Sequence, residues 1–462
     1  MCLMCCLFNE VSIILDRKLN ISYNVLDNIE TGFDRMNGEK QMNSDILKAI
    51  IYDQHQIIRD SIIINREYTF EKNGNYVLTG LRRAGKSTLL YKIAKELVAE
   101  GAEWNQIIYI NFEDERLSEF TLKDFNDIRL VASEMSEKKS YFFLDEVQNV
   151  EGWESFARRI ADAKERVYIT GSNAQMLSKD MEARLGGRYF TKYISPYNFR
   201  EYLTAKKVQH DEAAVRTTKL NGRIRAALGS YFHEGGFPES LLFQTKREYV
   251  ENIYQKILLG DIVARNSIRN PDAMRILMKK IAETVMHEVS YTKLHNIVNS
   301  IGIKVSKDSL INYVSYAEDA YLIFHIQNYV AAFVEKESVP KYYFNDNSLL
   351  NLFLIRKDSA LLENMVAITL QRRYPGGLYY FKSSKTGIDI DFYIPEERTA
   401  IQVALSIQGE ARTREAGNLI RAKKEVKESE RFVIVTYEEE ELIEEEGVQI
   451  EVIPLYRFLL DL

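Results

Sequence analysis

Apolar positions follow a regular strand–helix alternation between residues 75 and 170. Short apolar runs of strand length are separated there by longer segments in which apolar residues recur every three or four positions, as in amphipathic helices. Such alternation predicts a parallel sheet covered by helices on both faces. The expected strands are 76–79, 106–111, 140–145 and 166–170, and the expected helices are 44–59, 86–100 and 153–164.

The pattern changes near residue 199. The segment 199–285 is predicted to be mostly helical, and the order helix, helix, strand within 286–335 indicates a winged-helix unit. From residue 341 the pattern predicts a mixed α/β segment, and the acidic run 438–446 predicts a solvated loop. The elements expected in the last two segments are helices 291–300, 307–319 and 361–374 and strands 321–328, 378–382, 388–394 and 400–405.

Composition is that of a folded protein without membrane spans. Apolar residues make up 46% and charged residues 28% of the chain, and no apolar run approaches the ~20 residues that a membrane helix needs. The net charge of -6 disfavours a protein that coats nucleic acid, although a local basic patch is compatible with it. All three cysteines, Cys2, Cys5 and Cys6, lie at the N-terminus, so the body has no disulfide framework and a cytoplasmic location is expected. Residues 1–41 are predicted to be a disordered extension.

A glycine-rich motif lies between the first predicted strand and the helix that follows it. Residues 80–87 read Gly-Leu-Arg-Arg-Ala-Gly-Lys-Ser, which fits the phosphate-binding pattern G-x-x-x-x-G-K-[ST]. The glycines let backbone N–H groups surround phosphate oxygens, and the helix directs its positive end at the anion. We therefore expect Lys86 to contact the β- and γ-phosphates of ATP and Ser87 to bind Mg²⁺. The residues expected to bind the nucleotide are Gly80, Arg83, Ala84, Gly85, Lys86, Ser87 and Thr88.

Two acidic residues end the third predicted strand, where ligands of open α/β sheets bind. Asp145 follows four apolar residues and is expected to hold Mg²⁺, directly or through water. Glu146 is expected to be the general base that polarises the attacking water. The strand 106–111 falls between the loop and this pair in sequence, which allows it to lie between their two strands in the sheet, as in NTPases that use an additional catalytic glutamate.

Further polar residues follow the fourth predicted strand. Ser172 or Asn173 could sense the γ-phosphate and orient water, with Asn173 as the chosen candidate, and a simple turn is the alternative. Arg184 and Arg188 are candidates for an arginine finger, with Arg188 as the chosen one. Such a finger acts within the chain or on a neighbouring subunit of an oligomer, and structural ion pairs explain both arginines equally well.

These motifs resemble those of a widespread group of prokaryotic AAA-type ATPases that carry a C-terminal region of uncharacterised function. The resemblance rests on residues 80–88, 142–153, 170–188, 196–203, 235–239 and 261–263. It implies an α/β fold with a P-loop NTPase core built on a parallel sheet, followed by a helical and winged-helix region and a small nuclease-like α/β domain. The expected divisions are a disordered extension (1–41), an ATPase domain (42–205), a helical and winged-helix region (206–340) and a restriction-endonuclease-like domain (341–462).

The last of these domains is similar to nucleases that place acidic residues and a lysine around Mg²⁺. Ala404 occupies the lysine position here, and alanine can neither activate water nor steady a phosphate. Nuclease activity is therefore not expected, unless Lys382 or Lys385 substitutes. The residues at the acidic positions are Glu363, Asp391 and Gln402.

The sequence thus predicts an ATPase that couples Mg-ATP hydrolysis to action on nucleic acid or on a protein partner. A slow nucleotide-gated switch without motor activity is the first alternative, and an ATP-regulated nuclease is the second. No membrane partner is expected, and an oligomer is expected if the arginine finger acts on a neighbouring subunit.

Overall fold

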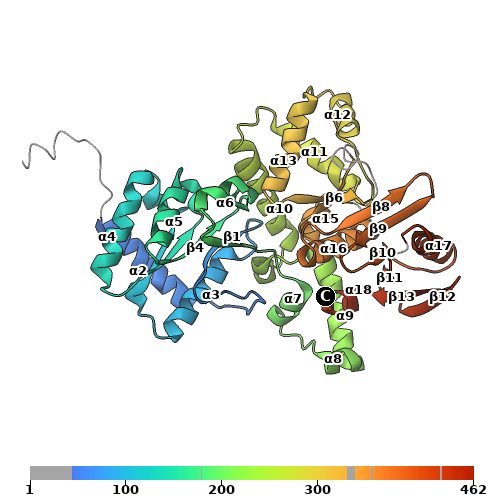
Figure 1. Cartoon of the computed structure of the whole chain (residues 1–462), viewed down its shortest axis with the longest axis horizontal. Helices are drawn as coiled ribbons and strands as arrows, with labels where there is room; N and C mark the ends of the chain where they lie inside the picture. Colours follow the sequence, from blue (N-terminus) through green and yellow to red (C-terminus); the bar gives the residue numbers. More distant parts are fainter. Residues whose placement is uncertain (1–43, 178, 330–338, 355–356, 427–428, 462) are drawn as a thin grey trace, which may run out of the picture.

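The computed structural model describes residues 44–461 except 178, 330–338, 355–356 and 427–428. The predicted extension 1–41, with the three cysteines, lies outside the described residues. Two sheets lie toward opposite ends of the long axis, and helices lie between and around them (Figure 1). No described helix combines the length and the apolar composition needed to cross a membrane.

The first sheet is parallel and has the order β2-β3-β4-β1-β5, which confirms the predicted α/β core. One expected position is wrong, because β4 rather than 106–111 lies between β1 and β3, and β2 forms the edge. Both strands are almost entirely buried, so their apolar patterns contain no signal that orders them. The strands are β1 (Asn75–Thr79), β2 (Ile107–Asn111), β3 (Tyr141–Asp145), β4 (Arg166–Gly171) and β5 (Tyr189–Tyr193).

Helices cover both faces of this sheet. Because side chains alternate along a strand, Val77 and Ile108 share a core with α4 and α5 on one face. Tyr76 and Tyr109 share a core with α3 on the other face. The helices of this half are α2 (Ser44–Asp60), α3 (Lys86–Ala99), α4 (Phe125–Met135), α5 (Trp153–Asp162) and α6 (Lys179–Leu185).

The second sheet is mixed and has the order β12-β13-β11-β10-β9-β8-β6-β7, which confirms a second α/β unit. Residues of α17 pack on one face, and residues of α16 and α18 pack on the other. The strands are β6 (Ile323–Asn328), β7 (Lys341–Phe344), β8 (Tyr379–Ser383), β9 (Ile388–Ile394), β10 (Thr399–Val403), β11 (Arg431–Thr436), β12 (Glu441–Glu445) and β13 (Val448–Pro454). The helices are α15 (Asn347–Asn351), α16 (Asp358–Arg373), α17 (Glu410–Glu425) and α18 (Leu455–Asp461).

The acidic run 438–446 is not a loop, contrary to the prediction. Its central part is β12, which pairs antiparallel with β13 at the edge of the second sheet. Ile443 is buried, whereas the residues on either side of it are exposed. Charged residues are typical of edge strands because they discourage pairing with another chain. Because this strand has only one buried apolar side chain among its carboxylates, the sequence pattern did not indicate a strand here.

Helices connect the two sheets. A single apolar core extends from Leu81 in the phosphate loop through these helices to Leu460 in α18. The strand β6 follows α13 and joins the second sheet, so the boundary predicted at residue 340 falls inside one sheet. The winged-helix unit stays a prediction. The helices are α7 (Phe199–Ala205), α8 (Glu212–Arg216), α9 (Thr218–Glu234), α10 (Lys246–Lys256), the π-helix η7 (Ile257–Ala264), α11 (Pro271–Glu283), α12 (Tyr291–Ser300) and α13 (Lys307–Asp319).

Candidate functional site

The phosphate loop connects β1 to α3, as the sequence predicts. Gly80 and Gly85 have φ angles of 147° and 92°, and a Cβ at Gly80 would lie 2.0 Å from the carbonyl O of Ile194. A side chain therefore does not fit at Gly80. The helix α3 begins at Lys86, so its N-terminus faces the loop. Lys86 is buried, and its Nζ donates to the carbonyl O of Gly80 at 3.0 Å and to that of Leu81 at 3.2 Å.

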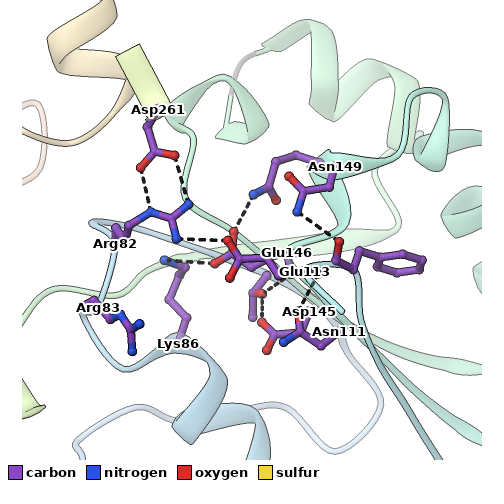
Figure 2. A network of polar contacts seen from close by, with 12 residues as sticks. Arg82, Arg83, Lys86, Asn111, Glu113, Asp145, Glu146, Asn149 and Asp261 are labelled. Carbon is purple, nitrogen blue, oxygen red and sulfur yellow. Dashed lines mark hydrogen bonds and ion pairs between the residues drawn. The ribbon is translucent and has the colours of Figure 1, made fainter. Parts of the chain in front are cut away.

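The first acidic residue, Asp145, lies at the carboxyl end of β3 and beside the loop (Figure 2). It is 1% exposed and accepts hydrogen bonds from the hydroxyl groups of Tyr109, at 2.7 Å, and of Thr170. Burial, and then the charge of Glu146, raise the pKa of Asp145, and the hydroxyl groups of Thr170, Tyr109 and Ser87 act in the opposite direction. The two predicted Mg²⁺ ligands, Ser87 and Asp145, thus lie close together.

The second acidic residue, Glu146, faces the loop lysine. Its Oε1 lies 3.8 Å from Lys86 Nζ. Its φ angle of 51° is uncommon for a residue other than glycine, and its N–H donates to Thr170 Oγ1 at 2.9 Å. Burial alone would raise the pKa of Glu146, but the charge of Lys86 and a hydrogen bond from Gln148 outweigh burial and hold it below its ordinary value. Glu146 is therefore ionised at neutral pH, as a general base must be.

The residues after β4 lie at the same edge of the sheet. Because β4 lies between β3 and β1, Ser172 and Asn173 follow a strand end that is flanked by the acidic pair and by the loop. Both are buried, and the Ser172 Oγ has no hydrogen-bond partner among the described residues. Thr170, which the sequence analysis overlooked, contacts both acidic residues.

Arg188 does not reach the loop of its own chain. Its neighbour Tyr189 pairs with Asn75 at the amino end of β1, whereas the loop follows the carboxyl end of that strand. Arg188 is bound to Asp162, and Arg184 is bound to Glu154 in the same way. Arg188 is therefore not an arginine finger for the phosphate loop of its own chain, contrary to that form of the prediction. Its action on a neighbouring subunit stays a prediction.

Arg82 joins the loop to the π-helix η7 (Figure 2). Its Nε and Nη2 donate to the carboxylate of Asp261 at 2.8 and 3.1 Å, and its Nη1 donates to Glu113 at 3.0 Å. Arg265 lies 3.9 Å from the same Asp261. The charges of Arg82 and Arg265 also help to lower the pKa of Glu146. Two arginines of the same chain therefore act electrostatically on the predicted general base.

Arg66 and Arg83 hold the loop from other sides. Arg66 is 6% exposed, donates to the carbonyl O of Ala84 at 2.9 Å and forms two hydrogen bonds of 2.9 Å with Glu201. Arg83, in contrast, is exposed and donates to Glu239 at 3.0 Å. Thr88, the last of the residues expected to bind the nucleotide, lies in the first turn of α3. It lines a small recess of about 20 Å³ with Gly85 and seven other residues.

The residues at the predicted nuclease positions do meet in the second sheet, and a lysine joins them. Lys341 Nζ lies 3.4 Å from Asp391 Oδ1 and 3.6 Å from Glu363 Oε1. Gln402 Oε1 accepts a hydrogen bond from the N–H of Asp391 at 2.8 Å. Lys341 and Glu363 are each 1% exposed, so this cluster lies inside the protein.

The structure thus places a lysine beside these carboxylates, although Ala404 stands at the position where the sequence pattern expects one. That lysine comes from β7, whereas Lys382 binds Glu288 and Asp389 instead. The ammonium group of Lys341 lies in contact with both carboxylates. Over the described ranges, no group of three or more His, Cys, Asp or Glu side chains is arranged to hold a metal ion.

Comparison with known proteins matches two parts of the chain. Residues 72–203 match an AAA domain, and residues 225–360 match a domain of unknown function, DUF8612. The predicted AAA-type P-loop core is thereby confirmed, and the restriction-endonuclease-like assignment stays a prediction.

Among solved structures, the chain is similar to a Walker-type ATPase of Pyrococcus abyssi, with 15% identity, coverage of 63% of this chain and 96% of that one, and a TM-score of 0.40. It is also similar to AMPPCP-bound DnaA of Aquifex aeolicus, with 15% identity, coverage of 58% and 88%, and a TM-score of 0.23.

Two curated relatives match most of the chain. An uncharacterized protein of Haemophilus influenzae is 28% identical over 384 residues, which are 81% of this chain and 92% of the relative. The uncharacterized protein MJ1544 of Methanocaldococcus jannaschii is 30% identical over 430 residues, which are 90% of this chain and 95% of the relative. By this similarity, the chain belongs to the protein family of MJ1544, and it carries an AAA domain.

Proposed function

We propose that this protein binds ATP at the phosphate loop and hydrolyses it with the help of Mg²⁺. One observation supports the proposal most directly: Lys86, Glu146 and the Ser87–Asp145 pair converge at the carboxyl end of a parallel sheet. A carboxylate and a hydroxyl group suit Mg²⁺, which proteins commonly hold through one or two carboxylates together with substrate phosphates. Bound Mg²⁺ supplies charge neutralisation at the β- and γ-phosphates.

In the proposed reaction, Lys86 exchanges its bonds with the loop carbonyls for bonds with phosphate oxygens. The ionised Glu146 accepts a proton from the water whose oxygen attacks the γ-phosphorus, and the bond from that phosphorus to the bridging oxygen of ADP breaks. Arg82 and Arg265 supply positive charge beside the carboxylate that takes the proton.

We further propose that hydrolysis moves the helical region and so acts on nucleic acid or on a protein partner. Arg82 binds Asp261, and Arg83 binds Glu239. Two residues of the loop therefore contact the segment that follows the AAA domain. A change in loop position on nucleotide binding or phosphate release therefore alters the contacts of that segment. A slow switch uses the same contacts but turns over rarely.

The test is Mg²⁺-dependent ATP turnover and ATP binding by the wild type and Glu146→Gln, each with and without single-stranded and duplex DNA. We expect Glu146→Gln to bind ATP and to lose turnover by about 10²- to 10³-fold. Glu96→Gln, an exposed substitution on α3, is the matched control and should be unchanged. Full turnover by Glu146→Gln contradicts the assignment of the base.

Stimulation of ATP turnover by DNA favours a nucleic-acid partner, and equal rates with and without DNA count against one. Tight binding with very slow turnover and a nucleotide-dependent change of shape favours the switch.

A further inference from the structure

A cavity of about 910 Å³ lies between the AAA domain and the second sheet. One wall is formed by β5 and nearby residues, and the other by β6 and the end of α16. Pockets of roughly 300–1,000 Å³ are the size that small molecules occupy. The lining side chains that matter for its chemistry are Tyr68, Lys192, Tyr193, Tyr321, Phe324 and Arg372.

One cation in this wall, Arg372, forms no direct ion pair within the described part of the chain. Its Nε is buried without a hydrogen-bond partner there. Its electrostatic neighbours are tyrosines and the carboxylates of Glu201 and Asp346. Glu201 already forms two hydrogen bonds with Arg66, and Asp346 already accepts hydrogen bonds from Gly236 and Ser348. A guanidinium N–H that is buried without an acceptor is costly unless a ligand supplies one.

The other charged groups of the wall leave this positive charge in place. The Glu318 carboxylate lies against His325 Nδ1, which neutralises it only when the imidazole is protonated. Glu67 is exposed at the rim, and Lys192 on β5 adds a second cation. The cavity therefore combines two cations with aromatic rings.

From this geometry we propose that the cavity binds a small anionic molecule that carries a flat ring. Arg372 and Lys192 bind its phosphate or carboxylate group, and the guanidinium group of Arg372 suits two parallel hydrogen bonds to such an anion. The ring packs against the aromatic side chains of Tyr68, Tyr193 and Phe324.

Tyr321 connects this site to the phosphate loop. Its hydroxyl group lies 2.7 Å from Thr79 Oγ1, and its ring centroid lies 5.1 Å from that of Tyr193. Thr79 is the last residue of β1 and directly precedes Gly80. A ligand that contacts Tyr193 and Tyr321 therefore changes the packing of the strand that leads into the loop. If the proposed ATP site is correct, the ligand should change its nucleotide affinity by about five- to 150-fold.

The experiment is calorimetric titration of the full chain with AMP, inorganic phosphate and adenosine, without any measurement of ATP turnover. We expect AMP to bind more tightly than phosphate, and adenosine to bind least. Arg372→Gln should weaken AMP binding about tenfold or more, because a charge-assisted contact is lost. Lys192→Gln, on the edge strand β5, should weaken it in the same direction if the first variant does not fold. Lys86→Gln should leave binding at this site unchanged.

Binding that survives Arg372→Gln and Lys192→Gln but is lost in Lys86→Gln would assign AMP to the phosphate loop and overturn the proposal. Failure of AMP and phosphate to bind at millimolar concentration overturns it as well. Equal affinity for AMP and phosphate removes the role of the ring. None of these results depends on whether the loop hydrolyses ATP, so failure of this site is distinct from failure of the proposed function.

Discussion

Replacing Arg82 with methionine tests whether the loop is held by the helical region. The side chains of Arg82 and Asp261 are 15% and 5% exposed, and two hydrogen bonds join them. Removing one member of a buried ion pair costs about 3–5 kcal/mol when the other charge is left alone. Asp261 keeps Arg265 at 3.9 Å, so we expect a smaller cost, about 2–3 kcal/mol, for local opening of this contact.

Native-state hydrogen exchange is the suitable assay, because a chain of this size need not unfold in one step. Amides of the loop 80–85 and of η7 report the local opening. A cost of about 2–3 kcal/mol corresponds to exchange that is about 30- to 140-fold faster in Arg82→Met. Amides of β11, in the second sheet, should be unchanged.

Arg83→Met is the matched control. Arg83 also lies in the loop and forms an ion pair with Glu239, but these side chains are 55% and 45% exposed. Exposed ion pairs contribute about 0–1 kcal/mol, so exchange should rise by less than about fivefold. If the two variants accelerate exchange equally, burial of the Arg82 pair does not determine its strength and the reasoning is refuted.

Three further predictions concern single residues. Burial raises the pKa of Glu363 to about 7. Between about pH 4.5 and pH 7 the folded state therefore keeps a proton that the unfolded state has lost, so the stability of the protein falls as the pH rises through this range. The melting temperature of Glu363→Gln should rise relative to that of the wild type between pH 5 and pH 8, and a difference in melting temperature that does not change with pH contradicts this. Gly80→Ala should cost more than about 2 kcal/mol, because the added Cβ meets the carbonyl O of Ile194, and a melting temperature equal to that of the wild type would contradict the steric argument. Thr170→Val removes the hydroxyl group that contacts Asp145, so Mg²⁺-dependent ATP turnover should fall about tenfold or more while the fold persists by circular dichroism; an unchanged rate would exclude a positioning role for this hydroxyl.

Local sequence was sufficient for the centre of the candidate site. The loop, Lys86 and Ser87 are consecutive, and Asp145 and Glu146 end one apolar strand, so their proximity follows from the geometry of a parallel sheet. The groups that hold the loop are a different case. Arg82 and Asp261 are 179 positions apart, and no spacing rule connects them.

The same limit explains the error at the second sheet. The nuclease pattern places the lysine at position 404, with Lys382 and Lys385 as possible substitutes. Lys341 instead lies on β7, which is at the opposite end of that sheet from β12. The position of β4 between β1 and β3 likewise could not be predicted from the sequence, because β2 and β4 have similar apolar patterns.

The contacts around the phosphate loop also determine which fragments of this chain keep the loop intact. A fragment that ends with the AAA match at residue 203 lacks Asp261 and Glu239, so Arg82 and Arg83 lose these carboxylates. It also uncovers Leu81, whose core continues as far as α18. We therefore expect the isolated fragment to aggregate or to bind nucleotide poorly even if the full chain binds it well. Expression of the full chain is then the sound starting point for any biochemical study, because the AAA match ends before the carboxylates that bind Arg82 and Arg83.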